Sequence, residues 1–160
     1  MRLGVISDTH GLLRPEVFDV FSQVDRILHA GDIGPEEVLI ELEAIAPVTA
    51  VYGNTDGFAI RDRCPKVATF EWDGLCFTLT HGDQFGTPNP ATLRREFPEA
   101  DVLIYGHTHV PLLEWVDKTV TVMNPGPAGQ ANLKSPPSVG IMELEPGLPP
   151  RARLVPLVGG

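Results

Sequence analysis

Three short apolar runs near the start of the chain alternate with helix-like segments, and this alternation is the strongest constraint on the fold. The runs are Arg2–Ile6, Asp25–Leu28 and Val48–Tyr52. Pro15 and Gly34-Pro35 mark the starts of the two intervening helices, because the first helical turn tolerates proline. The apolar faces expected for these helices are Val17, Phe18, Phe21 and Val24 in the first, and Val38, Leu42 and Ile45 in the second. Such alternation indicates a parallel sheet with helices packed on it.

The rest of the chain reads mainly as hairpins. The predicted strands are Lys66–Trp72, Leu75–Thr80, Asp101–Tyr105, Leu112–Val116, Thr119–Met123, Val139–Leu144 and Arg151–Val155. Asn89 is expected to cap a helix that Pro90 begins, and the Pro- and Gly-rich stretch Asn124–Pro137 is expected to be a loop. We therefore expect an α/β fold with one partly parallel sheet and a second, mainly antiparallel one. The 160 residues fit one domain, taken as residues 1–160.

Five polar segments follow predicted strands, and each carries side chains that can bind a metal ion. They are Asp8-Thr9-His10, Gly31-Asp32, Gly53-Asn54, His81-Gly82 and Gly106-His107-Thr108-His109. Taken singly, each has an ordinary explanation, because Asp, Asn and Gly are common turn residues. Five such segments in this order are hard to obtain by chance. Since ligands bind beyond the carboxyl ends of strands in α/β sheets, the set predicts one metal centre.

The spacing of the candidate ligands restricts how they bind. Asp8 and His10 are two residues apart, so an extended chain directs both toward one cation. His107 and His109 could hold one ion together, or one each of two neighbouring ions. The remaining histidine, His29, precedes Gly31-Asp32. We expect His29 to be a structural or supporting residue that orients Asp32 through a hydrogen bond.

The types of donor atom limit the choice of metal. Nitrogen and oxygen donors without thiolates suit Mn, Fe, Ni, Co or Zn better than Ca or Mg. We expect two divalent ions per chain, with Mn first among the candidates. Ions about 3.5–4 Å apart can clamp a phosphoryl group and activate a water. Asp32 is the predicted bridging carboxylate, and a neutral Asn54 ligand helps to keep the centre positive.

With Asn124-Pro125-Gly126 added, these motifs resemble the calcineurin-like metallophosphoesterases, specifically their small bacterial and archaeal phosphodiesterase branch. The resemblance extends from about Leu3 to Gly126. It implies a four-layer αββα sandwich of two mixed β-sheets, and in-line attack on phosphorus by a metal-bridging hydroxide. It also implies that one metal takes Asp8, His10, Asp32 and His109, and that the other takes Asp32, Asn54, His81 and His107.

Three positions depart from the pattern of many relatives. Thr55 stands where larger members have a His that contacts phosphate and can protonate the leaving group. Asp83 replaces a second His after His81-Gly82, and Pro127 replaces a Ser after Asn124-Pro125-Gly126. No leaving-group acid is therefore assigned, and good, aryl-type leaving groups should be favoured. Asn54 and Thr55 are the expected substrate-binding residues.

The function expected from the resemblance is hydrolysis of a small phosphate ester, with a phosphodiester first. One alternative is a non-catalytic metal-binding scaffold, because a retromer subunit resembles this fold and serves mainly as a protein-binding platform. All seven ligand positions here carry competent side chains, which favours the enzyme. Another alternative is a metal-dependent hydrolase of other esters or of amides.

Charge argues against some partners. The chain has 12 basic and 21 acidic residues and a net charge of −9, so no nucleic-acid surface and no anionic membrane partner is expected. No apolar run reaches the length of a membrane span, and the N-terminal residues do not read as a signal peptide. Cys64 and Cys76 are expected to be reduced thiols. The expected location is cytoplasmic, and assembly into a homo-oligomer (dimer or tetramer) is considered.

Overall fold

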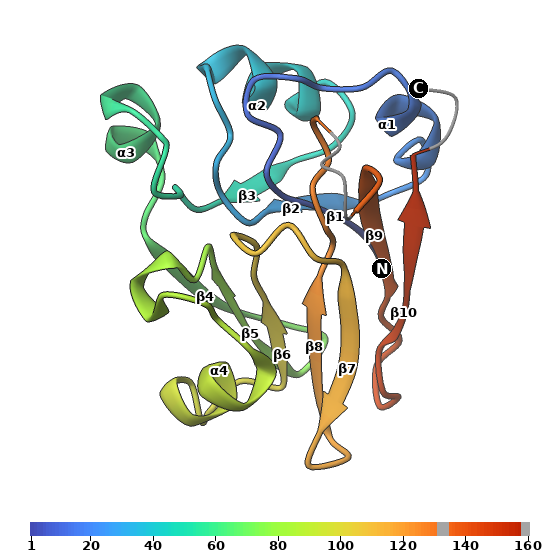
Figure 1. Cartoon of the computed structure of the whole chain (residues 1–160). Coiled ribbons are helices and arrows are strands. Elements are labelled where there is room, and N and C mark those ends of the chain that lie inside the picture. Colours follow the sequence, from blue (N-terminus) through green and yellow to red (C-terminus); the bar gives the residue numbers. More distant parts are fainter. Residues whose placement is uncertain (131–134, 158–160) are drawn as a thin grey trace.

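The first sheet of the computed structural model, which describes residues 1–130 and 135–157, has the strand order β10-β9-β1-β2-β3 (Figure 1). Its strands are β1 (Arg2–Ile6), β2 (Arg26–His29), β3 (Val48–Ala50), β9 (Ser138–Glu143) and β10 (Arg151–Pro156). β1, β2 and β3 pair in parallel, which confirms the expectation from the strand and helix alternation. β9 is antiparallel to β1, and β10 is antiparallel to β9.

Three helices cover the outer face of this sheet: α1 (Glu16–Val20), α2 (Glu36–Glu43) and α3 (Phe58–Arg63) (Figure 1). Val17, Phe21 and Val24 are buried as expected, but Phe18 is 40% exposed, so its place in the apolar face was predicted wrongly. The reason is that α1 ends at Val20, and Phe21 and Val24 are buried by the turn that follows it. Helix α3 was not predicted, because Ile60 is its one buried residue and makes no apolar periodicity.

The second sheet has the order β4-β5-β6-β8-β7. Its strands are β4 (Val67–Trp72), β5 (Leu75–Thr80), β6 (Val102–Ile104), β7 (Leu112–Val116) and β8 (Val120–Asn124). The β4–β5 and β7–β8 hairpins are antiparallel as predicted, but β5–β6 and β6–β8 are parallel. The expectation of a mainly antiparallel second sheet is thus wrong. Helix α4 (Pro90–Glu96) carries the chain from the edge hairpin back into the middle of the sheet, which makes the crossover parallel.

Three apolar layers hold four structural layers together. One layer, which includes Phe21, Ile27 and Leu42, lies between the first sheet and α1–α3. A second, which includes Leu28, Phe77 and Met142, lies between the two sheets. The third lies between the second sheet and α4, around Leu93 and Val122 (Figure 1). This arrangement is the four-layer αββα sandwich of two mixed sheets that the resemblance implies.

Two further predictions concern the cap of α4 and the loop that follows β8. Asn89 caps α4 as predicted, since its side-chain oxygen accepts a hydrogen bond from the Thr92 N–H at 2.9 Å. Of the expected loop Asn124–Pro137, Asn124 ends β8 and residues 131–134 lie outside the described residues; the described remainder contains neither helix nor strand.

In the described ranges, no helix has both the length and the apolar character that crossing a membrane requires.

Candidate metal centre

The loops that follow β1, β2 and β6 contain most of the strained backbone in the described chain. Eight non-glycine residues of the described chain have positive φ, and the five that lie in these loops are all expected ligands: Asp8 (54°), His10 (46°), Asp32 (55°), His107 (69°) and His109 (59°). Each such conformation costs on the order of 1 kcal/mol or more, and persists only where surrounding contacts impose it. Backbone bonds from Asp8 N to Gly31 O (3.0 Å) and from His10 N to Asp32 O (2.9 Å) impose it here.

Asp8 is fully buried at the meeting point of these loops. Its Oδ2 accepts hydrogen bonds from the Ser7 hydroxyl (2.6 Å) and the His107 N–H (3.3 Å). Its Oδ1 lies 3.1 Å from His109 Nε2. Burial alone would raise the pKa of Asp8, but hydrogen bonds with His10 and His109 hold this pKa well below its usual value. The carboxylate is therefore ionised, with one oxygen tied to the protein and the other directed at imidazoles.

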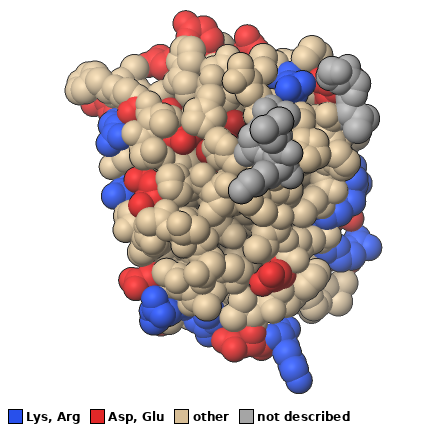
Figure 2. Space-filling model, viewed as in Figure 1, with Lys and Arg blue, Asp and Glu red and all other residues tan. Residues whose placement is uncertain are grey.

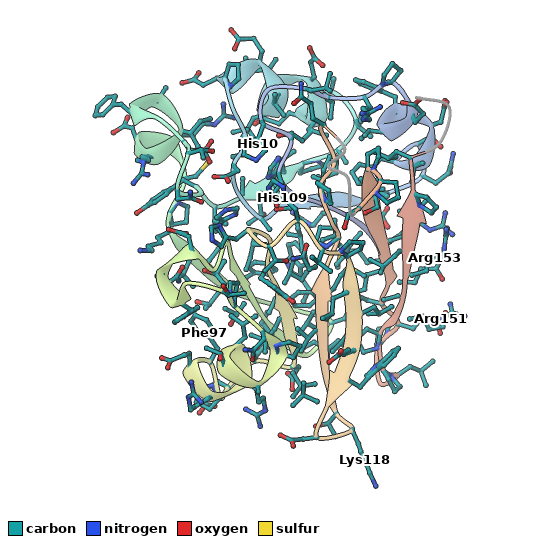
Figure 3. All side chains as sticks on the ribbon, viewed as in Figure 1. His10, Phe97, His109, Lys118, Arg151 and Arg153 are labelled. Atoms are coloured by element: carbon teal, nitrogen blue, oxygen red, sulfur yellow. The ribbon has the colours of Figure 1, made fainter. Side chains whose placement is uncertain are left out.

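His10 and His109 face one another beside Asp8. Their Nε2 atoms are 3.4 Å apart, with the rings edge to face and their centroids 5.4 Å apart. Figure 3 shows the two side chains next to each other, where the loops of the two sheets meet. His10 Nε2 also lies 3.7 Å from Asp8 Oδ1 and 3.7 Å from Asp32 Oδ2. Two imidazole nitrogens and two carboxylate oxygens thus converge on one small volume.

His81 approaches the same volume from the end of β5. Its Nδ1 lies 2.8 Å from the Ala30 carbonyl oxygen, so Nδ1 carries the proton and donates it there. In the neutral ring Nε2 then carries the lone pair, and this atom is buried and without a hydrogen-bond partner among the described residues. It lies 3.1 Å from Asp32 Oδ2 and 3.9 Å from Asp8 Oδ1. A buried acceptor that faces two carboxylates suits a cation between them.

Asp32 is oriented by the neighbouring loop. The Thr55 N–H donates to its Oδ1 at 3.0 Å, which leaves Oδ2 directed at His10 and His81. Burial raises the pKa of Asp32, but the interaction with His81 and the hydrogen bonds from Thr55 lower it overall. Asp32 is therefore a second ionised carboxylate at the centre.

Two overlapping donor groups result among the residues that the structure describes. In each group all ligand atoms lie within 4.8 Å of one another; the groups are Asp8, His10 and His109, and Asp8, Asp32 and His81. His107 lies outside both groups, with its ring 5.1 Å from that of His81. Asn54 is exposed and adjoins the centre through its neighbour Thr55. The fold thus brings five of the seven expected ligands into direct proximity and sets the other two beside them.

His29 was expected to bond Asp32, and this expectation is wrong. The buried ring accepts the Gly31 N–H at Nδ1 (3.1 Å), and its Nε2 lies 3.0 Å from the Thr9 hydroxyl oxygen. Because Nδ1 accepts, Nε2 donates, and the Thr9 hydroxyl in turn donates to the Ile33 carbonyl (2.7 Å). His29 therefore joins the two loops that carry Asp8 and Asp32 without touching either carboxylate. A β-strand alternates its side chains, so sequence adjacency was a poor guide to this partner.

The burial of His29 predicts a pH dependence of stability. Burial lowers the pKa of His29 from 6.5 to about 3. Between these two pH values the His29 ring is protonated in the unfolded chain and neutral in the native chain. This contribution is present above pH 6.5 and is lost as the pH falls toward 3, with a slope of up to about 1.4 kcal/mol per pH unit. Urea unfolding of metal-free wild type and His29→Gln between pH 7 and 4.5 measures it. We expect a shallower slope in the variant; parallel slopes would contradict the assignment.

Other residues at the centre were missed by the sequence analysis. Ser7 and Asn124 are both buried and polar. Ser7 bonds Asp8 directly, and Asn124 Nδ2 donates to the Gly106 carbonyl (3.2 Å) and the Thr108 hydroxyl (2.9 Å), which holds the loop of His107 and His109. Their positions in the sequence could have indicated these roles, because Ser7 directly precedes Asp8 and Asn124 begins the Asn124-Pro125-Gly126 motif.

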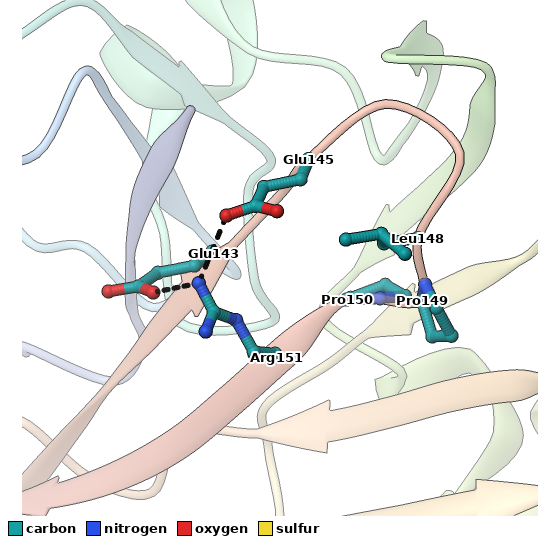
Figure 4. A pocket seen from close by; sticks show the side chains of 6 residues that line it. All are labelled: Glu143, Glu145, Leu148, Pro149, Pro150 and Arg151. Carbon is teal, nitrogen blue, oxygen red and sulfur yellow. Dashed lines mark hydrogen bonds and ion pairs between the residues drawn. The ribbon is translucent and has the colours of Figure 1, made fainter.

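A cavity of about 260 Å³ lies elsewhere, at the β9–β10 turn, lined by Glu143, Glu145, Leu148, Pro149, Pro150 and Arg151 (Figure 4). Arg151 donates to Glu143 at 3.0 Å and to Glu145 at 3.3 Å. These charged groups are paired with one another and form no donor set comparable to that around Asp8. Figure 3 shows Arg151 well separated from His10 and His109.

The fold has two facing mixed sheets, and carboxylates and imidazoles converge where their strands end. This arrangement is typical of metal-dependent hydrolases with an αββα fold. The family model described as "Calcineurin-like phosphoesterase superfamily domain" matches residues 1–147. The chain belongs to this family, and it is thus a hydrolase that acts on phosphoric ester bonds.

Individual proteins agree with this assignment. The chain is 40% identical over 153 residues to a probable metallophosphoesterase of Methanothermobacter thermautotrophicus, covering 91% of this chain and 87% of the relative. The structure of an archaeal phosphodiesterase is 31% identical, with a TM-score of 0.76, and the match covers 97% of this chain and 100% of that one. Vps29 of Entamoeba histolytica, solved with Zn²⁺, is 20% identical with a TM-score of 0.80, covering 99% and 100%. This last likeness shows the fold alone.

Proposed function

We propose that the chain hydrolyses small phosphodiesters with two divalent cations per chain. The proposed ligands are Asp8, His10, Asp32, Asn54, His81, His107 and His109. One observation carries the proposal: His81 Nε2 is buried, has no hydrogen-bond partner among the described residues and faces the carboxylates of Asp32 and Asp8. A cation satisfies an imidazole lone pair and two carboxylates together, and nitrogen and oxygen donors suit manganese, nickel, iron, cobalt or zinc.

The distances support a division of the ligands between two ions. Asp8, His10 and His109 form one donor group, in agreement with the first ion implied by the resemblance. Asp32 Oδ2 lies within 3.7 Å of donors that belong to each ion, His10 and His81, which supports Asp32 as the bridge. Asp8 is common to both donor groups, so its charge acts on both ions. His107 and Asn54 complete the second ion's ligands in this proposal.

The cations, when bound, would supply positive charge to the phosphoryl oxygens and activate the water that hydrolysis consumes. Residues of the chain hold the ligands of these cations in position. Ala30 holds the tautomer of His81, and Ser7 holds Asp8, so both ligands are set before a cation arrives. Asn54 and Thr55 are exposed at the rim and are proposed to contact the substrate phosphate.

A small diester is the proposed substrate because the similar archaeal structure is that of a phosphodiesterase. Two further observations restrict the leaving group and the size of the substrate. Thr55 offers no imidazole to protonate a leaving group, so aryl-type leaving groups are favoured. The net charge of −9 and the scattered Lys and Arg side chains on the face in Figure 2 argue against a nucleic-acid partner.

Hydrolysis assays test this function. Metal-stripped protein is titrated with Mn²⁺, Ni²⁺, Co²⁺, Zn²⁺ or Mg²⁺ and assayed on bis-(p-nitrophenyl) phosphate and on p-nitrophenyl phosphate. We expect metal-dependent turnover that favours the diester by roughly tenfold, which is about 1.4 kcal/mol of transition-state free energy. Folded protein without turnover at any metal would refute the proposal.

The second candidate is a non-catalytic, metal-binding scaffold, which the fold likeness to Vps29 supports. It predicts metal binding without hydrolysis, so the same titration followed by calorimetry separates the two candidates. We further propose that residues 1–160 are one domain, that the protein is cytoplasmic, and that copies can associate as a dimer or tetramer.

A further inference from the structure

Asp56, two residues beyond Asn54, is a buried acid that is not directed at the metal centre. Its Oδ1 accepts the N–H groups of Ile33 (2.8 Å) and Gly34 (3.1 Å). Its Oδ2 accepts the N–H of Gly53 at 2.8 Å. Both carboxylate oxygens thus accept hydrogen bonds from the backbone. These bonds account for the burial of Asp56 without a bound metal ion.

The partners of Asp56 flank two proposed ligands. Ile33 directly follows Asp32, and Gly53 directly precedes Asn54. One carboxylate therefore joins the loop after β2 to the loop after β3, at the points where each loop presents a ligand. Asp32 and Asn54 are the carboxylate and the amide proposed for the same cation, so the bond network of Asp56 spans the two sides of that site.

Arg61, from α3, holds the other side of the second loop. Its Nε donates to the Asp56 carbonyl at 2.7 Å, and its Nη2 lies 3.3 Å from the Asn54 carbonyl oxygen. Its guanidinium stacks over the Tyr52 ring, 4.6 Å from the centroid. The backbone of the Gly53–Asp56 loop is thus fixed at the Gly53 N–H by Asp56 and at its carbonyls by Arg61.

We propose that Asp56 and Arg61 are positioning residues that set the separation of Asp32 and Asn54, and so govern the affinity for the second cation more than that for the first. The inference rests on the two-cation function proposed above. The first cation shares Asp32, but its other ligands, Asp8, His10 and His109, are held by Ser7, the His107 N–H and each other, and have no bond to either positioning residue. Losing such supporting contacts typically lowers metal affinity by about 10–100-fold.

Calorimetric titration of metal-stripped protein with Mn²⁺ or Co²⁺ tests the inference. In Asp56→Asn, an amide N–H₂ would face backbone donors and disturb both loops. Arg61→Gln removes the carbonyl contacts from a residue that is itself exposed, so it tests the same idea if Asp56→Asn fails to fold. In both variants we expect the second site to be weakened by about tenfold or more and the first site by clearly less, with Arg61→Lys restoring part of the loss.

Arg63→Gln is the matched control, because Arg63 lies on the same helix and pairs with Glu43 at the surface. It should bind two ions as the wild type does. A wild type that binds two ions and hydrolyses diesters, with Asp56→Asn and Arg61→Gln binding both as tightly, would overturn the inference and leave the proposed function intact. Equal weakening of both sites, together with a lower unfolding temperature, would also overturn it. A wild type without any metal binding would instead refute the proposed function.

Discussion

Replacing Asp8 by asparagine is expected to lower the rate of diester hydrolysis by at least about 1,000-fold, or roughly 4 kcal/mol of transition-state free energy. Asp8 belongs to both donor groups, so the loss of its charge should weaken both proposed cations. Asparagine keeps the size of the side chain and can still accept a hydrogen bond from Ser7 or His107, which preserves the local fold. The loss should therefore arise from the metal centre and not from unfolding.

Metal content after dialysis and kcat/KM on bis-(p-nitrophenyl) phosphate measure this effect. Mn²⁺ should raise the unfolding temperature of the wild type, because a ligand that binds the native state stabilises it, and should leave Asp8→Asn nearly unchanged. Asp19→Asn removes a carboxylate on the exposed side of α1 and serves as the control. If Asp8→Asn retained activity within tenfold of wild type, Asp8 could not be shared by the catalytic cations.

Replacing Gly53 by alanine is expected to damage the centre through sterics alone. A Cβ at this position would lie 2.2 Å from Asp32 Oδ1 and 2.5 Å from the Asp32 backbone nitrogen. Neither atom can withdraw cheaply, since Asp32 is held by Thr55 and has a left-handed backbone. We expect a loss of about 2–3 kcal/mol in the unfolding free energy of metal-free protein, typical of overpacking. Displacement of Asp32 should also lower activity by at least about 100-fold, since it disturbs the proposed bridge.

Gly57→Ala is the matched control for Gly53→Ala. It lies four residues further along the same stretch of chain, and a Cβ there would meet no heavy atom within 4 Å. Its unfolding free energy should stay within about 0.5 kcal/mol of wild type. Urea unfolding and metal titration of the two variants give the comparison. If the two variants had the same unfolding free energy and metal affinity, the loop after β3 could move away from Asp32. The close packing of Gly53 against Asp32 would then not constrain the site.

The strands, the hairpins and the candidate ligands were predictable because they depend on local patterns. The alternation of apolar runs placed β1, β2 and β3, and the Asp73-Gly74 turn placed the β4–β5 hairpin. Asp8, His10, Asp32, His81 and His109 could be named because each follows such a run, and parallel strands deliver their carboxyl ends to one edge. Which ion each ligand binds still stands as a proposal.

The errors share one physical cause. The exposure of Phe18, the parallel pairs in the second sheet and the partners of His29 all depend on which segments meet in space. Helix α3 escaped prediction because its single buried residue, Ile60, leaves no periodic pattern. None of these features leaves a signal in the neighbouring residues.

The sequence by itself determined the order of the elements and the chemical types of the proposed metal ligands, because local runs and motifs specify both. Only the tertiary structure decided that Asp8 belongs to two donor groups and that His81 Nε2 is buried without a hydrogen-bond partner in the described chain. It also decided that Asp56 and Arg61 join the Asp32 and Asn54 loops. The physical reason is that hydrogen bonds and van der Waals contacts act over a few ångströms. Residues tens of positions apart acquire them only when the two sheets pack together.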